Sequence, residues 1–314
     1  MFKKNRVVWS GLTRIIAGSS LILLYLLVGT AASQGKDHEA SPPNNSICPT
    51  PDSQHATDPT AATTASSEQS VIPPGTILPV RLQNTISSDK SKPGQIIFGK
   101  IVQEVPLPNG SVLRKGTKIE GRIVEVTPAG TASGSKISLR FDKVYSRDKM
   151  IPVTTDLRAI AGFMTVQEAG VPEEAPSEGT PYTWLTTTQI GGDSVYGLGG
   201  PVMSAENPSE VVGKSVNDGV LSRVSAKEGT NCRGPIDGNN NPQALWVFSS
   251  DACGIYGMEH VKIAHAGRTD PVGTISLVSD GSKLKIPAAT GILLRVNAPS
   301  REKSVAANTD KPQY

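Results

Sequence analysis

Aromatic side chains are scarce in this 314-residue chain, at 4% of residues, whereas glycine and proline are abundant, with 31 and 24 copies. So many turn formers argue against a helical bundle and favour short strands joined by turns. The composition therefore predicts a mostly-β fold, with small Gly/Pro-rich barrel or sandwich modules and one or two short helices.

The chain also lacks a basic stripe that would fit nucleic acid. Its net charge is +3, but Lys3, Lys4, Arg6 and Arg14 all lie in the first 33 residues, which contain no Asp or Glu. The remainder carries 3 − 4 = −1, so no nucleic-acid partner is expected.

The basic start is followed by an apolar segment, residues 15–32, and by small residues up to Ser33. This order predicts a signal peptide or signal anchor over residues 1–33. The apolar segment is slightly shorter than the roughly 20 residues that span a bilayer, so cleavage is favoured over retention. In both cases the rest of the chain is exported to the periplasm or beyond, and only residues 15–32, if uncleaved, contact the membrane.

Four further regions follow from composition and periodicity. Residues 34–70 are rich in Ser, Thr, Ala and Pro and predict a disordered linker. A β-barrel-like module is expected at 71–170, a second β-rich module with a disulfide loop at 171–298, and a disordered tail at 299–314.

Alternating or β-branched apolar residues predict the strands of both modules. These segments are 77–82, 96–105, 111–126, 135–146, 150–157, 244–249, 261–266, 273–279, 283–287 and 290–297. A short helix is predicted at 157–167. Residues 209–224 fit either a helix, with Ser209 as N-cap, or a strand, and the helix is the prediction. Residues 72–82 also resemble residues 286–296, which indicates either a duplicated strand module or a chance match.

The first module resembles a known family. A Pro-x-Gly-Thr strand start, a Pro-Gly turn and a Gly-Thr-x-x-x-Gly-Arg strand follow one another, and the matching residues are Pro74, Gly75, Thr76, Pro93, Gly94, Gly116, Thr117, Gly121 and Arg122. Residues 71–155 are in this respect similar to the C-terminal barrel of the TrbI-type proteins of conjugation and type IV secretion. The resemblance implies a barrel behind a membrane segment and a Pro-rich tether, in an assembly of the cell envelope. Residues 182–297 have no counterpart in that family and are more like uncharacterised exported bacterial proteins.

Only three cysteines are present, and two of them, Cys232 and Cys253, bracket a loop rich in Gly, Pro and Asn. Nearby thiols pair in an oxidising compartment, and such a bond stabilises by about 3 kcal/mol. We therefore predict a structural disulfide between Cys232 and Cys253. Cys48 is left over, either free or linked to another chain.

Other site patterns are incomplete. Asp237, Asn239 and Asn241 have the alternating spacing of a calcium loop, but Pro242 and Phe248 replace the glycine and glutamate that an EF-hand requires. They stay weak calcium candidates beside a plain turn. The Gly-Lys-Ser sequence at 213–215 lacks the first glycine of a phosphate loop, where Pro208 stands.

Cysteine chemistry is a further alternative. Cys253 with His260 or His265 is compatible with a thiol nucleophile and its base, or, together with Cys232, with a zinc site. Catalysis needs a free thiolate, and zinc sites of this type use a CxxC spacing that is absent. No catalytic, cofactor or metal site is therefore predicted.

The sequence favours a non-enzymatic exported protein of the cell envelope. It would serve as a structural or assembly module with a TrbI-like β domain, and its partners would be envelope proteins or further copies of itself. One alternative is a soluble periplasmic or extracellular module that binds a glycan or another small ligand. In that case Tyr182, Trp184, Trp246 and Tyr256 would form a stacking platform; otherwise they belong to the core. The second alternative is an unrecognised hydrolase.

Overall fold

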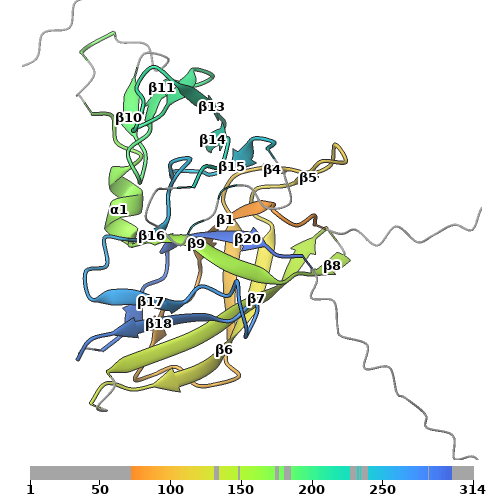
Figure 1. Ribbon diagram of the computed structural model, residues 1–314, viewed down its shortest axis with the longest axis vertical. Coiled ribbons are helices and arrows are strands. Elements are labelled where there is room, and N and C mark those ends of the chain that lie inside the picture. Colours follow the sequence, from red (N-terminus) through yellow and green to blue (C-terminus); the bar gives the residue numbers. More distant parts are fainter. Residues whose placement is uncertain are drawn as a thin grey trace, which may run out of the picture. The chain divides into compact units, whose positions relative to one another are not determined.

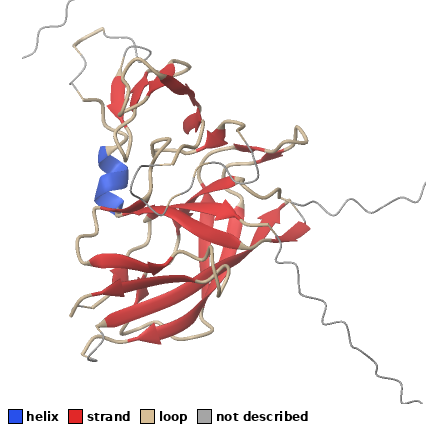
Figure 2. Ribbon diagram, in the orientation of Figure 1, coloured by secondary structure: helices blue, strands red, loops and turns tan. Residues whose placement is uncertain are grey.

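The structure is a computed structural model that describes residues 72–130, 134–147, 149–173, 177–179, 185–226, 232, 234, 240–281 and 283–298. Figure 2 shows that strands are the main secondary structure of this part of the chain, beside one short helix, α1 (Phe163–Glu168). The prediction of a mostly-β fold is thus confirmed. The expected signal segment, the linker, the tail and Cys48 lie outside the described residues.

A ten-stranded sheet curls into a nearly closed barrel (Figure 1). Its strands are β1 (Ile77–Leu82), β3 (Ile96–Ile101), β6 (Lys118–Thr127), β7 (Ser135–Ser146), β8 (Lys149–Pro152), β9 (Thr155–Ala161), β16 (Gly254–Tyr256), β17 (Val261–His265), β18 (Ile275–Ser279) and β20 (Gly291–Val296). The strand order is β16-β9-β20-β1-β3-β6-β7-β18-β17, with β8 paired to β7. The two ends of this order are consecutive in the chain, and the Leu157 amide donates to the Ala266 carbonyl at 2.8 Å, which brings the ends together. The barrel takes strands from both predicted modules, 71–170 and 171–298.

A six-stranded sheet lies between β9 and β16 in the sequence. Its strands, in spatial order, are β10 (Thr186–Thr188), β11 (Ser194–Tyr196), β12 (Pro201–Met203), β13 (Val211–Val216), β14 (Gly219–Ser222) and β15 (Gln243–Ala244). Two small ribbons complete the fold, β2 (Ile86–Ser87) with β19 (Lys285–Ile286), and β4 (Val105–Pro106) with β5 (Val112–Leu113). We refer to the six-stranded sheet as the inserted sheet.

The interior of the barrel is apolar, because alternate residues of β3, β6 and β7 point inward. A second apolar cluster covers the outer face of β1, β9 and β20 and includes Val166 of α1 together with Trp246 and Phe248. These three barrel strands are therefore buried on both faces. The inserted sheet and α1 shield one side of the barrel from water.

The two similar segments, 72–82 and 286–296, occupy equivalent positions. β1 and β20 pair antiparallel, and each is preceded by a turn with a left-handed residue, Gly75 (φ 82°) and Ala289 (φ 66°). Four backbone bonds repeat the same pattern at both ends of the pair: Gly75 to Val296 (2.8 Å), Val296 to Thr76 (2.9 Å), Ala289 to Leu82 (2.8 Å) and Leu82 to Thr290 (3.0 Å), donor first. The sequence similarity thus corresponds to a local twofold arrangement.

The predicted helix at 157–167 is wrong over its first half. Residues 157–161 belong to β9, every residue of which is buried. Because β9 is covered on both faces, its apolar residues are not confined to alternate positions: Ala159, Ile160 and Ala161 form a continuous apolar run, which periodicity alone cannot assign to a strand or a helix.

The predicted helix at 209–224, with Ser209 as N-cap, is also wrong. The segment forms the hairpin β13–β14, in which Val216 pairs with Gly219. The two residues of the turn are Asn217 and Asp218, and Asp218 has a left-handed backbone (φ 67°), which Asn and Asp tolerate better than most residues. The turn signal Asn217-Asp218-Gly219 therefore outweighs the helical spacing of the valines.

The predicted strand at 244–249 is wrong beyond Ala244. Trp246 has φ 55°, and the Phe248 amide donates to the Leu245 carbonyl at 2.9 Å, so the chain turns here. This turn carries the indole to the site described next.

Candidate functional site: the Trp246 pocket

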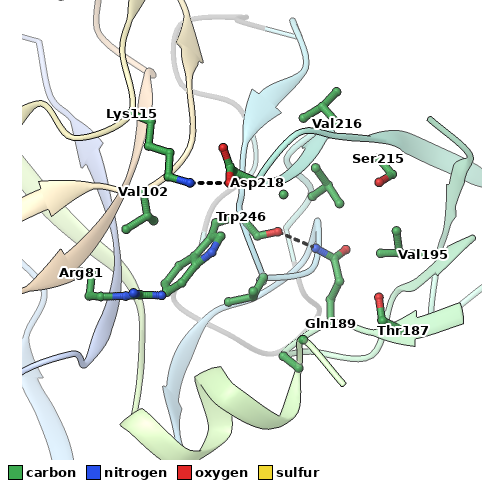
Figure 3. A pocket seen from close by; sticks show the side chains of 15 residues that line it. Arg81, Val102, Lys115, Thr187, Gln189, Val195, Ser215, Val216, Asp218 and Trp246 are labelled. Carbon is green, nitrogen blue, oxygen red and sulfur yellow. Dashed lines mark hydrogen bonds and ion pairs between the residues drawn. The ribbon is translucent and has the colours of Figure 1, made fainter. Parts of the chain in front are cut away.

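A cavity of about 390 Å³ lies between the rim of the barrel and the inserted sheet (Figure 3). We call it the Trp246 pocket. Among the residues that line it are Arg81, Val102 and Lys115 from the barrel side, Thr187, Val195 and Ser215 from the inserted sheet, and Asp218, Gln189, Trp246 and Val247 from turns and loops. Its walls thus combine an aromatic ring, charged groups, hydroxyls and an amide.

Trp246 is held in a conformation that a non-glycine residue seldom adopts. Its φ of 55° places it in the left-handed region, which costs energy for a bulky residue. Two buried amide side chains stabilise it: the Trp246 N–H donates to Gln103 Oε1 at 2.6 Å, and Gln189 Nε2 donates to the Trp246 carbonyl at 3.3 Å. Both backbone groups of the residue are therefore fixed by side chains from other parts of the chain.

Gln103 joins the barrel to the hairpin β13–β14. It is fully buried, and its Nε2 donates to the Val220 carbonyl at 2.7 Å while its Oε1 accepts from Trp246. Gly219 makes this approach possible, because a Cβ there would lie 2.4 Å from Gln103 Oε1 and 2.6 Å from Trp246 Cα. The position can hold only glycine without a shift of its neighbours.

Gln189 presents an acceptor to the pocket. The side chain is 5% exposed, and its Nε2 donates to the carbonyls of Trp246 (3.3 Å) and Phe248 (2.8 Å). Because both N–H groups have acceptors, the orientation of the amide is fixed. Its Oε1 has no hydrogen-bond partner within the part of the chain that the structure describes, and Figure 3 shows it on the side of Thr187 and Val195.

Arg81 lies against the indole ring. Its guanidinium carbon is 5.1 Å from the ring centroid of Trp246, which is the range of a cation–π interaction. At the mouth of the pocket Lys115 forms an ion pair with Asp218, and these side chains are 54% and 42% exposed. The cation at the wall is thus packed on an aromatic face, whereas the cation at the mouth is paired.

The predicted disulfide is present near this site. Cys232 and Cys253 are bonded, with their Cα atoms 5.8 Å apart. The Cys253 amide donates to the Tyr256 hydroxyl at 3.0 Å, so Tyr256 braces the bridge. The bond fixes the chain that leads from the inserted sheet back to β16 of the barrel.

A buried charged cluster surrounds the disulfide. Asp156 of β9 is fully buried and pairs with Arg268 Nε at 3.3 Å and with Arg295 Nε at 3.5 Å. Burial raises the pKa of the Asp156 carboxyl, although the two guanidinium groups oppose this change. An Arg268 nitrogen also lies 3.5 Å from Cys232 Sγ.

Arg158 ties the same region to the inserted sheet. Its guanidinium donates to the carbonyls of Ser225 (2.6 Å) and Ser250 (3.0 Å). Burial lowers its pKa to about 10, which leaves it charged at neutral pH. The only sequence signal for this cluster is the presence of charged residues inside otherwise apolar strands.

The structure describes only some of the other predicted site residues. Asp237 and Asn239, with Tyr182 and Trp184 of the proposed stacking platform, lie outside the described residues. Asn241 uses its backbone carbonyl to accept from Gln243 Nε2 at 3.0 Å. Within the described ranges no group of three or more His, Cys, Asp or Glu side chains is placed to hold a metal ion.

His265 is part of a local turn. Its Nδ1 lies 2.7 Å from the Thr274 carbonyl and its Nε2 3.2 Å from the Thr269 hydroxyl. Sequence reasoning named Trp246 but missed Gln103, Gln189 and Arg81, because isolated polar residues in and between strands carry no motif.

No protein-family model matches the chain, and no curated protein matches it in a sequence search. No helix within the described ranges has the length and apolar character to cross a membrane.

Proposed function

We propose that the protein is an exported, non-enzymatic protein of the cell envelope that binds a small polar ligand in the Trp246 pocket. The observation that carries this proposal is Gln189, a buried amide in the wall of the pocket whose orientation is fixed and whose buried oxygen has no partner among the described residues and lies on the side of Thr187 and Val195 in Figure 3. A buried acceptor without a partner is costly, and a bound donor group removes that cost. The binding alternative derived from the sequence thus gains a defined site.

Export is supported by the disulfide and by the start of the sequence. Disulfides persist in oxidising compartments such as the periplasm, and the Cys232–Cys253 bond closes a loop that includes β15. Residues 1–33 have the order of a signal segment.

A relation to the TrbI-type barrels remains part of the proposal. The four resembling segments form β1, β3, β6 and β7, which are adjacent in the sheet. The motif glycines Gly75, Gly94 and Gly116 have φ values of 82°, 82° and 88°, so each is needed at a turn. These features support a related barrel more directly than they support a secretion channel.

Assembly through strand edges is less well supported than ligand binding. The end strands β16 and β17 are consecutive in the chain, and beside them the Leu157 amide of β9 donates to the Ala266 carbonyl that follows β17. The outer strand β8 carries Lys149 and Pro152, and lysine and proline are residues that protect a sheet edge from pairing with another chain. The pocket offers a more specific binding surface than either edge.

The hydrolase alternative would use the Cys253 thiol as its nucleophile, and in this structure that thiol is part of a disulfide. Cys253 Sγ is bonded to Cys232, and a disulfide sulfur cannot serve as a thiolate nucleophile. The groups that line the pocket are suited to binding and orientation.

A ligand-observed NMR screen of small polar compounds against the full chain tests the binding proposal. Thr187→Phe places a ring in the pocket from β10, whereas Thr188→Phe places the same ring on the exposed side of that strand. We expect compounds whose binding is lost in Thr187→Phe and kept in Thr188→Phe. A screen in which every bound compound is insensitive to Thr187→Phe would contradict the proposal.

Export is tested separately, by fractionation of producing cells followed by N-terminal sequencing. We expect the protein in the periplasm or the medium, or in the inner membrane if residues 15–32 are retained. Recovery in the cytoplasm with both thiols free would overturn this part of the proposal.

A further inference from the structure

The Trp246 pocket contains a positive charge that the protein itself does not neutralise. No carboxylate lies within ion-pair distance of the Arg81 guanidinium among the residues that the structure describes, and its only side-chain interaction there is with the indole. The other cation of the pocket, Lys115, is paired with Asp218. Arg81 Nε is buried and has no hydrogen-bond acceptor within the same residues.

We propose that the ligand of the pocket is a small carboxylic acid that also carries an N–H or O–H donor. Its carboxylate would bind Arg81, whose planar guanidinium matches a carboxylate with two parallel hydrogen bonds. Its donor would bind Gln189 Oε1, a carbonyl oxygen that can only accept. The amide cannot turn its NH2 group to this side, because both Nε2 hydrogens are held by the carbonyls of Trp246 and Phe248. This inference rests on the proposed binding function and adds the chemical class of the ligand.

The Arg81 guanidinium and Gln189 Oε1 lie on different walls of the pocket, so a ligand that binds both has a defined orientation. Arg81 belongs to β1 of the barrel, and Gln189 follows β10 of the inserted sheet, with Trp246 between them in Figure 3. The indole supplies an apolar surface for the carbon skeleton that joins the carboxylate to the donor. A ligand with only one of the two groups would leave either the cation or the acceptor without a partner.

The volume limits the size of this acid. Sites for small molecules begin at roughly 300 Å³, and the pocket measures about 390 Å³. A single sugar acid or an N-acylated amino acid is of suitable size. The shared chemistry therefore has two sources, a uronic acid unit of a glycan and the carboxyl end of a peptide.

Matched pairs of probes separate the two sources. Calorimetry of the full chain with methyl galactopyranosiduronic acid, a glycoside whose carboxyl group is free, and methyl galactopyranoside compares a sugar acid with its neutral analogue. N-acetylalanine and N-acetylalaninamide make the same comparison for a peptide end. We expect the acid of one pair to bind at least tenfold more tightly than its neutral partner, and the pair that shows this identifies the source.

A further peptide-like probe tests whether the ligand needs a hydrogen-bond donor. N-acetylproline retains the carboxylate of N-acetylalanine but has no amide N–H. If N-acetylalanine is the ligand class, N-acetylproline should bind at least tenfold more weakly because Gln189 Oε1 stays without a donor. Equal affinity of these two acids would contradict the role given to Gln189.

Two substitutions test the role of Arg81. Arg81→Gln should reduce the affinity for the acid to that for the neutral analogue, whereas Arg223→Gln, which removes a surface cation paired with Glu210, should leave it unchanged. Melting curves show whether both variants fold. The comparison of acid and neutral probes on the wild-type protein tests the proposal without any variant.

The outcomes separate this inference from the binding proposal. Equal binding of acid and neutral probes, lost in Thr187→Phe, would overturn the acid class and leave the binding function intact. An acid preference that survives in folded Arg81→Gln would overturn the role of Arg81. Absence of binding by all four probes would also overturn the inference, and the wider screen described above then decides the binding function alone.

Discussion

The barrel and the inserted sheet are stabilised by different kinds of interaction. The barrel encloses long runs of apolar side chains, such as Phe141 and Ile119, on strands of up to 12 residues. The inserted sheet has strands of two to six residues and is attached through buried polar side chains as well as apolar ones. Four of them, which we call the clamp residues, each bond backbone groups in other segments: Gln103, Gln189, Asp193 and Gln243.

This difference explains why the pocket lies at the inserted sheet. Apolar burial stabilises a fold without fixing directions, whereas a hydrogen bond fixes both distance and angle. Two of the clamp residues, Gln103 and Gln189, hold Trp246 in its left-handed conformation, and Gln189 Oε1 stays without a partner among the described residues. We therefore expect substitutions in the barrel to lower overall stability, and substitutions of the clamps to loosen the pocket first.

The largest effect is expected in the barrel. Phe141→Ala empties a site that is 1% exposed and should lower the free energy of unfolding by about 3–5 kcal/mol. Denaturant titration followed by circular dichroism measures this loss. The same change at Phe163, which is 42% exposed on α1, is the control and should have little effect. Similar losses in both variants would contradict the assigned core.

The next largest effect is expected at the disulfide that braces the inserted sheet. Replacing both Cys232 and Cys253 by Ser should lower stability by about 3 kcal/mol, because the denatured chain regains the entropy of the open loop. Thermal unfolding with and without reductant measures the effect. Reductant should destabilise the wild type and leave the double variant unchanged. Equal responses of the two proteins would show that the bond is not formed in solution.

A smaller effect is expected at a clamp. Gln103→Leu leaves the Trp246 N–H without a partner and removes one of the two hydrogen bonds to the Val220 carbonyl, which still accepts from the Leu245 amide at 3.1 Å, so we expect a cost of about 1–3 kcal/mol. The control is Gln95→Leu, since Gln95 is exposed and its side chain bonds only the Lys92 amide of its own turn. Chemical denaturation and ligand affinity are both measured. If Gln103→Leu weakens stability and binding no more than Gln95→Leu does, the clamp role is wrong.

The smallest effect depends on pH. The hydrogen bond from Lys283 lowers the pKa of the Asp89 carboxyl from 3.8 to about 2. The stabilisation that results is present above the unfolded pKa of 3.8 and is lost as the pH falls through about 2. Asp89→Asn should therefore lower the melting temperature slightly at pH 6 and have no effect near pH 2. A difference that grows with acidity would contradict the assigned shift.

The same contrast separates what the sequence predicts from what it does not. Half-buried barrel strands such as β7 alternate apolar and polar residues, so their positions follow from the pattern alone. The doubly buried strand β9 ends in the continuous apolar run 159–161, and the sequence assigns its residues from Leu157 onward to a helix. In the inserted sheet the sequence contains the turn signal at Asp218, but the helix prediction follows the spacing of the valines instead, and the structure adopts the turn.

The sequence predicts the disulfide but not the pocket. Pairing of Cys232 with Cys253 follows from their number, spacing and expected compartment. The left-handed backbone of Trp246 depends on Gln103 and Gln189, which lie 143 and 57 residues away in the chain. Contacts between such distant polar residues leave no local pattern, so only the three-dimensional structure shows them.

Native-state hydrogen exchange of the full chain, oxidised and reduced, tests the central claim most directly. The account predicts that amides of β1 and β20 stay strongly protected in both forms, while reduction speeds exchange at the Trp246 amide and along β13 and β14. If reduction instead lowers protection equally in the barrel and the inserted sheet, the two are one cooperative unit. The distinction between an apolar barrel and a polar, clamped binding region would then be contradicted.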